Sequence, residues 1–382
     1  MSREQLAAGL VVLALAVSAV GVVALPLGDP VAAPTDDASR ATQQESIGCD
    51  YRQLFDRTAG SVVAVQASGA QGTGFAVEVG ESGDGTLTVP NGSDAIDANA
   101  TYFVTNAHVV DGTSEVTVQF REGEYRNGTV IGRSTYADLA VVSVIDAPGY
   151  VAPLPVASDD PQRGRAVAAL GNPFGLRQTI THGIVSGLNR SMDTDLGFTI
   201  PNVVQTDAPI SPGNSGGPLV TCDGTVVGVN TAGIPSAKAE NIGFAVSASV
   251  VGEVVPELVA TGAFDYPFLG VSTQPVTPAV AQANDLDETR GVMVVGTLGD
   301  GPADGALNET ERFSTVDGTP VPMGGDVILA VDGESIRTGE DLASYLLTET
   351  EPGQTVELTV LRDGQRRTVS VTVGERPDPA TA

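Results

Sequence analysis

Short runs of apolar and β-branched residues recur between residues 50 and 262, with Gly, Asn and Asp between them. They include SVVAVQA, GTGFAVEV, YFVTN, EVTVQF, LAVVSV, AVAALG and TVVGVN. Closely spaced short strands of this kind are typical of an all-β barrel or sandwich. Asp223-Gly224, which lies between PLVTC and TVVGVN, predicts a hairpin turn.

The segment SASVVGEVVPELVATG (247–262) predicts a helix that closes this first unit. Ser247 suits the N-cap position and Gly262 suits the stop. Pro256 inside the segment predicts a kink or an early end, because proline removes a helical hydrogen bond. The first unit is therefore predicted to span residues 49–262.

A second, smaller unit of mixed α and β character is predicted at residues 265–375, followed by a tail at 376–382. Its predicted elements are strands at 291–297 and 326–333, a helix that starts near Thr338, and a hairpin at 354–373 that turns at Asp363-Gly364. Asp341 follows Thr338 by three residues, as in a capping box. We detect no internal repeat.

The N-terminal residues 1–27 predict a membrane anchor, because positions 6–27 carry no charged side chain and would span roughly 33 Å as a helix. Arg3 precedes the apolar stretch and acidic residues follow it, which favours an N-inside orientation. Residues 28–48 then form a flexible linker, and the rest of the chain lies outside the cytoplasm. The alternative is a signal sequence cleaved near Ala33, which would leave a secreted protein.

The charge balance is strongly acidic, with 47 Asp and Glu against 19 Lys and Arg and a net charge of −28. Such a surface repels phosphate backbones, so nucleic acid is not an expected partner. The composition resembles that of proteins from salt-loving organisms, where salt screens the repulsion between charges. Lys238 is the only lysine and lies in no phosphate-binding loop. The chain has two histidines and two cysteines, without HExxH or CxxC, so we expect no metal and no cofactor.

The two cysteines, Cys49 and Cys222, would face an oxidising exterior if the N-terminal segment directs export. A bridge between them would close a long loop and stabilise the fold by roughly 5 kcal/mol in the chain-entropy model. Two separate buried thiols are the alternative, and the sequence leaves both open.

Ser215 lies in TDAPISPGNSGGPLV and is a candidate nucleophile, provided that a base and an orienting acid accompany it. His108, in YFVTNAHVVDG just after a predicted strand, is the better candidate base; His182 lies inside a predicted strand. Asp138 opens the apolar run DLAVVSV, and a histidine N–H would be a suitable partner for a buried carboxylate there. Gly213 and Gly216 permit a tight chain path around Ser215. That path would direct the N–H groups of residues 213 and 215 at one oxyanion.

The motifs TNAHVV, ADLAVV, GNPFG, GIVSG, QTDAPISPGNSGGPLV and NIGFAV occur in the order found in the HtrA (Deg) family. The chain resembles this family of chymotrypsin-like serine proteases over roughly residues 55–375. The resemblance implies a mainly β protein with a double-barrel protease domain and a PDZ domain. It implies a triad of His108, Asp138 and Ser215, with oxyanion donors at Gly213 and Ser215.

The resemblance also implies a serine endopeptidase that needs no ATP and works as a homotrimer on misfolded or regulatory exported proteins. Pro209, six residues before the nucleophile, indicates a pocket for small or medium aliphatic side chains. The predicted pocket residues are Pro209, Ile210, Thr231 and Ala232. In the second unit, YPFLGV matches the family's carboxylate-binding loop, so Phe268, Leu269, Gly270 and Val271 are predicted to bind peptide C-termini.

Three features leave alternatives open. The insertions at 80–100 and 308–325 are expected to be solvated surface loops. His182 is expected to be structural, although it could lie near the substrate groove. A single anchor with a single PDZ unit resembles the regulatory DegS type, and the alternative function is a peptide-binding chaperone or sensor in which proteolysis is secondary or switched off.

Overall fold

The computed structural model describes residues 48–81, 83, 85–89, 96–172, 178–194, 198–231 and 242–377. The predicted anchor at 1–27 lies outside these residues, as do residues 28–47 of the predicted linker. Across the described ranges, none of the helices has the length and apolar character needed to cross a membrane.

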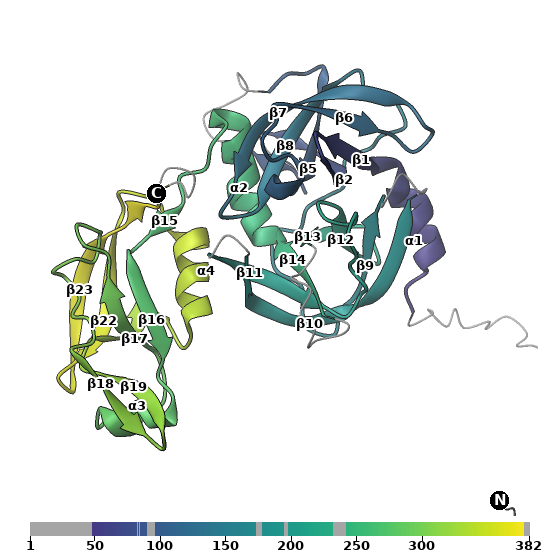
Figure 1. Cartoon of the computed structure of the whole chain (residues 1–382). Helices are drawn as coiled ribbons and strands as arrows, with labels where there is room; N and C mark the ends of the chain where they lie inside the picture. Colours follow the sequence, from purple (N-terminus) through teal and green to yellow (C-terminus); the bar gives the residue numbers. More distant parts are fainter. Residues whose placement is uncertain are drawn as a thin grey trace, which may run out of the picture. The chain divides into compact units, whose positions relative to one another are not determined.

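The first barrel closes from antiparallel strands in the order β1-β2-β5-β8-β7-β6 (Figure 1). Their bounds are Val62–Ala67 (β1), Ala70–Val77 (β2), Ala100–Thr105 (β5), Glu115–Gln119 (β6), Tyr125–Ser134 (β7) and Leu139–Ile145 (β8). The fully buried Phe75, Val104 and Val141 contribute to its core. Each strand predicted in this region is therefore a strand of the barrel.

The second barrel closes in the order β10-β11-β14-β13-β12-β9. Its strands are Ala166–Gly171 (β9), Thr179–Asp193 (β10), Thr199–Thr206 (β11), Pro218–Thr221 (β12), Val226–Thr231 (β13) and Gly243–Ser247 (β14). The pairing of Leu219 with Gly228 confirms the hairpin predicted at Asp223-Gly224, and Gly224 has a φ of 92°. The predicted double barrel is confirmed.

Helix α2 (Ala248–Thr261) follows the second barrel and packs on β7, β8 and β13 (Figure 1). Its ends agree with the prediction, since the Ser247 side chain accepts from the N–H of Val250 and Gly262 is left-handed with a φ of 84°. The predicted early end is wrong, because the helix continues through Pro256 to Thr261. The burial of Pro256 and its neighbours against the barrel offsets the lost hydrogen bond.

One short helix and a 3₁₀ turn precede the first barrel, and another 3₁₀ turn follows strand β5. Helix α1 (Tyr51–Thr58) begins after Asp50, whose side chain accepts from the N–H of Gln53, and a 3₁₀ turn follows at Ala59–Ser61. The sequence analysis did not predict α1, since its apolar residues are few. A second 3₁₀ turn, Ala107–Val109, carries His108 directly after β5.

The second unit is built on a sheet with the order β16-β17-β20-β22-β23, in which β21 pairs with β20. Its elements are β15 (Pro267–Phe268), β16 (Val271–Pro275), α3 (Pro278–Ala283), β17 (Val292–Thr297), β18 (Arg312–Val316), β19 (Thr319–Met323), β20 (Val327–Val331), β21 (Glu334–Ser335), α4 (Gly339–Glu349), β22 (Thr355–Arg362), β23 (Gln365–Thr372) and β24 (Gly374–Glu375). Strands β16 and β23 stand at the two ends of this order, so the outer edge of β16 is available to a further strand.

Local signals in this unit are confirmed. Thr338 and Asp341 form a capping box at the start of α4. Asp363 and Gly364 both have positive φ at the turn between β22 and β23, with values of 51° and 72°. Both residue types tolerate this conformation, which a two-residue hairpin requires.

The expectation of solvated loops is wrong for parts of both insertions. Residues 308–325 contain the paired strands β18 and β19. In the insertion at 80–100, the short strands β3 (Val79–Gly80) and β4 (Leu87–Thr88) pair in parallel, and Leu87 and Val89 are each only 4% exposed. These two side chains join the hydrophobic core of the first unit, although the residues around them in the sequence are polar.

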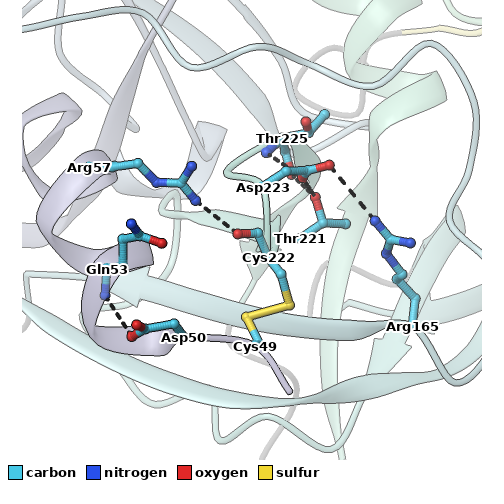
Figure 2. Close-up of a disulfide and its surroundings, with 9 residues drawn as sticks. All are labelled: Cys49, Asp50, Gln53, Arg57, Arg165, Thr221, Cys222, Asp223 and Thr225. Carbon is cyan, nitrogen blue, oxygen red and sulfur yellow. Dashed lines mark hydrogen bonds and ion pairs between the residues drawn. A yellow bond between two sulfur atoms is a disulfide. The ribbon is translucent and has the colours of Figure 1, made fainter. Parts of the chain in front are cut away.

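A disulfide joins Cys49 to Cys222 across 173 positions of the sequence (Figure 2). Cys49 lies directly before α1, and Cys222 lies in the turn between β12 and β13. The Arg57 guanidinium of α1 also donates to the carbonyl oxygen of Cys222 at 2.9 Å (Figure 2). The start of the first unit is thus held covalently to the hairpin that follows the Ser215 turn.

Replacing both cysteines with serine is expected to lower the free energy of unfolding by about 2–5 kcal/mol, because the unfolded chain regains the freedom of a long loop. Urea denaturation with and without reductant measures this change. Reductant should destabilise the parent and leave the double variant unaffected. Equal stability of the two proteins without reductant would contradict the expectation.

Candidate active site

Ser215 lies on a tight turn that leads into β12. Gly213 and Gly216, which flank it, have φ values of 98° and 82°, a region that favours glycine. The carbonyl oxygen of Asn214 accepts from the N–H of Gly217 at 2.9 Å, which closes the turn. Ser215 itself is 5% exposed. The glycines of the motif therefore meet a conformational requirement, as the sequence analysis expected.

Asp138 and His108 meet at the end of the first barrel. Asp138 occupies a left-handed position with a φ of 51° between β7 and β8, and it is 6% exposed. Nδ1 of His108 lies 2.9 Å from each of the two carboxylate oxygens. An ionised carboxylate only accepts, so Nδ1 carries the proton and Nε2 is left as the basic nitrogen. A general base in a serine hydrolase requires this tautomer.

Two further groups bind the carboxylate of Asp138, and a third binds its backbone. The backbone N–H of His108 donates to Oδ1 of Asp138 at 3.1 Å, and the Thr231 hydroxyl donates to Oδ2 at 3.1 Å. The Asn106 side chain donates to the backbone carbonyl of Asp138 at 2.8 Å. Neither role was predicted from the sequence. For Asn106 the available signal was a polar residue close to the candidate base His108, and for Thr231 no neighbouring residue gives such a signal.

The ionisation of His108 is set by opposing effects. Partial burial of the imidazole lowers the pKa of His108, but the hydrogen bond to Asp138 and the negative charge of that carboxylate outweigh it, so the pKa is raised above 6.5. The side chain is 51% exposed, and solvent screens part of this interaction. Protonated His108 therefore stabilises the fold below the unfolded pKa of about 6.5, and this contribution is lost as the pH rises through the folded pKa.

The acid limb of any His108-dependent rate is expected to have its midpoint above 6.5, because only neutral His108 can accept a proton. A pH profile of kcat/KM measures it. In the Asp138→Asn variant the remaining activity should titrate at lower pH, since burial then acts alone. An unchanged midpoint in that variant would contradict the assignment.

The residues predicted to form the substrate pocket take different places. The carbonyl of Pro209 accepts from the Thr181 hydroxyl at 2.7 Å, and Ile210 packs on the core of the second barrel and over Gly243. The Thr231 hydroxyl contacts Asp138. Ala232 lies outside the described residues.

His182 takes no part in the His108–Asp138 pair. Its ring stacks on Tyr51 of α1, with centroids 4.3 Å apart and planes at 17°. This contact lies close in sequence to Cys49, which the disulfide holds at the start of the first unit. A structural role for His182 agrees with the contact.

The four residues predicted to bind peptide C-termini lie together at the entry of β16. Phe268 ends β15, Gly270 has a φ of 71°, and Val271 begins β16. The Leu269 side chain is 1% exposed and belongs to the core, so this residue offers only its backbone. All four line a groove with Leu342 and Leu346 of α4.

No cluster of three or more His, Cys, Asp or Glu side chains is arranged to hold a metal ion in the part of the chain that the structure describes. The chemistry that the site offers is that of a hydroxyl, an imidazole and a carboxylate.

Comparison with known proteins identifies two domain families. Residues 72–229 match the trypsin-like peptidase domain, and residues 267–373 match the PDZ domain.

Related proteins carry consistent names. The chain is 37% identical over 288 residues to "Probable periplasmic serine endoprotease DegP-like" of Halomonas elongata, covering 75% of this chain and 57% of the relative. It is 36% identical over 333 residues to "Protease Do-like 1, chloroplastic" of Arabidopsis thaliana, covering 85% of this chain and 72% of the relative. The chain thus spans little more than half the length of the first relative.

A solved structure resembles the fold over most of both chains. It is an HtrA-type protease, AlgW, with a bound tripeptide, at 31% identity and a TM-score of 0.64. The match covers 86% of this chain and 98% of AlgW. Both units therefore have counterparts in one solved protein.

Proposed function

The chain belongs to the HtrA (Deg) family of serine proteases, and we propose that it is an endopeptidase that cleaves exported proteins through Ser215, His108 and Asp138. The observation that carries the proposal is the position of His108 Nδ1, 2.9 Å from the Asp138 carboxylate oxygens, which leaves Nε2 as the base. The glycine-flanked turn at Ser215 supplies the nucleophile.

The proposed reaction proceeds through an acyl-enzyme. Ser215 Oγ attacks the substrate carbonyl while His108 Nε2 takes its proton, and the N–H groups of Gly213 and Ser215 stabilise the oxyanion. His108 then gives the proton to the leaving amine. Water next attacks the acyl-enzyme while His108 Nε2 takes its proton, and the acid is released as Ser215 regains a proton from His108. Asp138 orients the imidazole and stabilises its charged form. The reaction requires neither ATP nor a metal.

The proposed substrates are misfolded or regulatory proteins outside the cytoplasm, with small or medium aliphatic residues before the cleaved bond. The position of Pro209, six residues before Ser215 in the sequence, supports this preference, since proline offers no charge to a basic side chain. We further propose recognition of peptide C-termini by residues 268–271, a homotrimer, and attachment to the membrane through residues 1–27. We propose that the protease domain spans residues 49–262 and that the PDZ domain spans residues 265–375.

A peptide-binding chaperone or sensor is the second candidate. The outer edge of β16 and the groove beside α4 favour it, because they offer a peptide site that needs no catalysis. Proteolysis would then be secondary.

Incubating the full chain with unfolded casein, at low and at molar salt, separates the two functions. Cleavage that stops in Ser215→Ala supports the endopeptidase. Suppression of casein aggregation, unchanged in that variant and without cleavage in the parent, would support the chaperone. A C-terminal peptide added to a silent parent tests whether activity requires an occupied 268–271 loop.

A further inference from the structure

Thr73 lies in β2 of the first barrel, in the sequence GTGF, and is completely buried. The sequence analysis treated this residue only as part of a strand. In the structure it lies against the turn that carries Ser215, which we call the nucleophile loop (residues 211–217). A buried hydroxyl needs partners, so its hydrogen bonds identify what it holds.

The side chain of Thr73 both donates and accepts. Its hydroxyl donates to the carbonyl oxygen of Gly213 at 2.6 Å. The same oxygen accepts from the backbone N–H of Asn172 at 2.8 Å, directly after β9. This hydroxyl therefore ties the nucleophile loop to the end of a strand in the second barrel.

The backbone of Thr73 makes two further bonds. Its N–H donates to the carbonyl oxygen of Ser215 at 2.8 Å. Its carbonyl oxygen accepts from the Thr105 hydroxyl at 2.7 Å, and Thr105 ends the strand that leads to His108. Thr73 is thus bonded to the element before the candidate base and to the loop of the candidate nucleophile.

These bonds fix the peptide groups around the proposed oxyanion donors. The carbonyl of Gly213 belongs to the peptide group that lies between the two groups carrying the N–H of Gly213 and the N–H of Ser215. Holding that carbonyl, together with the carbonyl of Ser215, restricts rotation on both sides of the Ser215 donor and on the C-terminal side of the Gly213 donor. Oxyanion stabilisation depends on donors held in place before the reaction.

Close packing against Thr73 also helps to explain why Gly216 follows Ser215. A Cβ on Gly216 would collide with the carbonyl oxygen of Thr73. At Gly217 the main obstacle to a Cβ is the carbonyl oxygen of Leu170, and Thr73 Cγ2 would lie 3.0 Å away. The nucleophile loop approaches Thr73 more closely than a side chain at position 216 would allow. The contact is therefore part of how the loop is shaped.

We propose that Thr73 is a positioning residue for hydrolysis, which holds the nucleophile loop with its two N–H donors directed at the oxyanion. The inference rests on the proposed function, since it concerns the same site. The Thr73 hydroxyl then has a role besides filling the core, and variants that change only the hydroxyl or only the methyl group can tell the two roles apart.

The test replaces Thr73 with valine, which keeps the shape and removes the hydroxyl. Thr73→Ser keeps the hydroxyl and serves as the conservative rescue. Thr58→Val is the matched control, because Thr58 is also buried, at 2% exposed, and its hydroxyl donates to Leu54 of α1 at 2.8 Å, away from the site. Each full-length variant is corrected for its folded fraction and assayed on an aliphatic peptide amide and with a peptide boronate, whose tetrahedral adduct mimics the oxyanion.

Thr73→Val is expected to lower kcat by about 10- to 10³-fold with little change in KM, an effect no larger than the loss of about 10²- to 10³-fold seen when an oxyanion donor is removed. Boronate affinity should fall in parallel with kcat/KM, while Thr73→Ser and Thr58→Val stay close to the parent. Parent-like kcat and boronate affinity in Thr73→Val would overturn the proposal. An equal loss in Thr73→Ser would overturn it too, because the hydroxyl would then not be the cause.

Folding of Thr73→Val and activity of the parent protein are both needed for this test. If Thr73→Val does not fold, Thr73→Ala carries the same comparison with Thr73→Ser. If the parent shows no hydrolysis that depends on Ser215, the proposed function fails, and the inference about Thr73 fails with it.

Discussion

Ser215→Ala is expected to reduce proteolysis by at least about 10⁴-fold, because the residual rate without a nucleophile comes only from binding and oxyanion stabilisation. The change removes one oxygen from a turn whose shape is set by glycines and backbone bonds, so the fold should persist. Digestion of unfolded casein, followed by mass spectrometry, measures the loss.

Ser211→Ala is the matched control, since Ser211 belongs to the same loop and its side chain is exposed. It should retain activity close to that of the parent. Activity in Ser215→Ala comparable to that of the control would show that another group performs the chemistry.

Asp138→Asn is expected to lower kcat by about 10⁴-fold, the size of effect known when the triad carboxylate of a serine protease becomes an amide. The amide nitrogen would face His108 Nδ1 as a donor, which favours the tautomer with the proton on Nε2. That tautomer cannot accept the proton of Ser215. The backbone N–H of His108 can still donate to an amide oxygen at the Oδ1 position, and the Thr231 hydroxyl can turn to accept from an amide nitrogen at the Oδ2 position. The loss should therefore lie in kcat and not in folding.

The control for this change is Asp111→Asn. Asp111 lies three residues after His108, and its carboxylate forms an exposed ion pair with Arg133 at 3.1 Å. Exposed pairs contribute little, so kcat should be unchanged. A similar loss of activity in both variants would mean that general electrostatics, and not the His108 tautomer, controls the rate.

The sequence predicted features that depend on neighbouring residues. Ser247 and Gly262 bound α2, Thr338 and Asp341 cap α4, and Asp363-Gly364 turn the last hairpin, as expected. In each case the signal is contained in a few consecutive residues whose backbone preferences decide the outcome. Resemblance to a family then identified the candidate triad, whose members are far apart in the chain.

Features that depend on distant contacts could not be predicted in this way. Thr73 meets Asn172 and Gly213 across 99 and 140 positions of the sequence, and nothing near GTGF indicates either partner. The Thr231 hydroxyl contacts Asp138 across 93 positions of the sequence. Leu87 lies in a polar insertion and yet is buried in the core. All three features depend on contacts between residues that are far apart in the sequence.

The central claim is that Ser215 forms a covalent intermediate with the substrate. The most direct test is reaction of the full chain with a fluorophosphonate, followed by mass spectrometry to find the modified residue and by casein digestion with the treated protein. We predict a single adduct on Ser215, a loss of proteolysis in proportion to its formation, and no adduct in Ser215→Ala. Proteolysis that continues while Ser215 is fully modified, or an adduct on a different residue that accompanies the loss, would contradict the account.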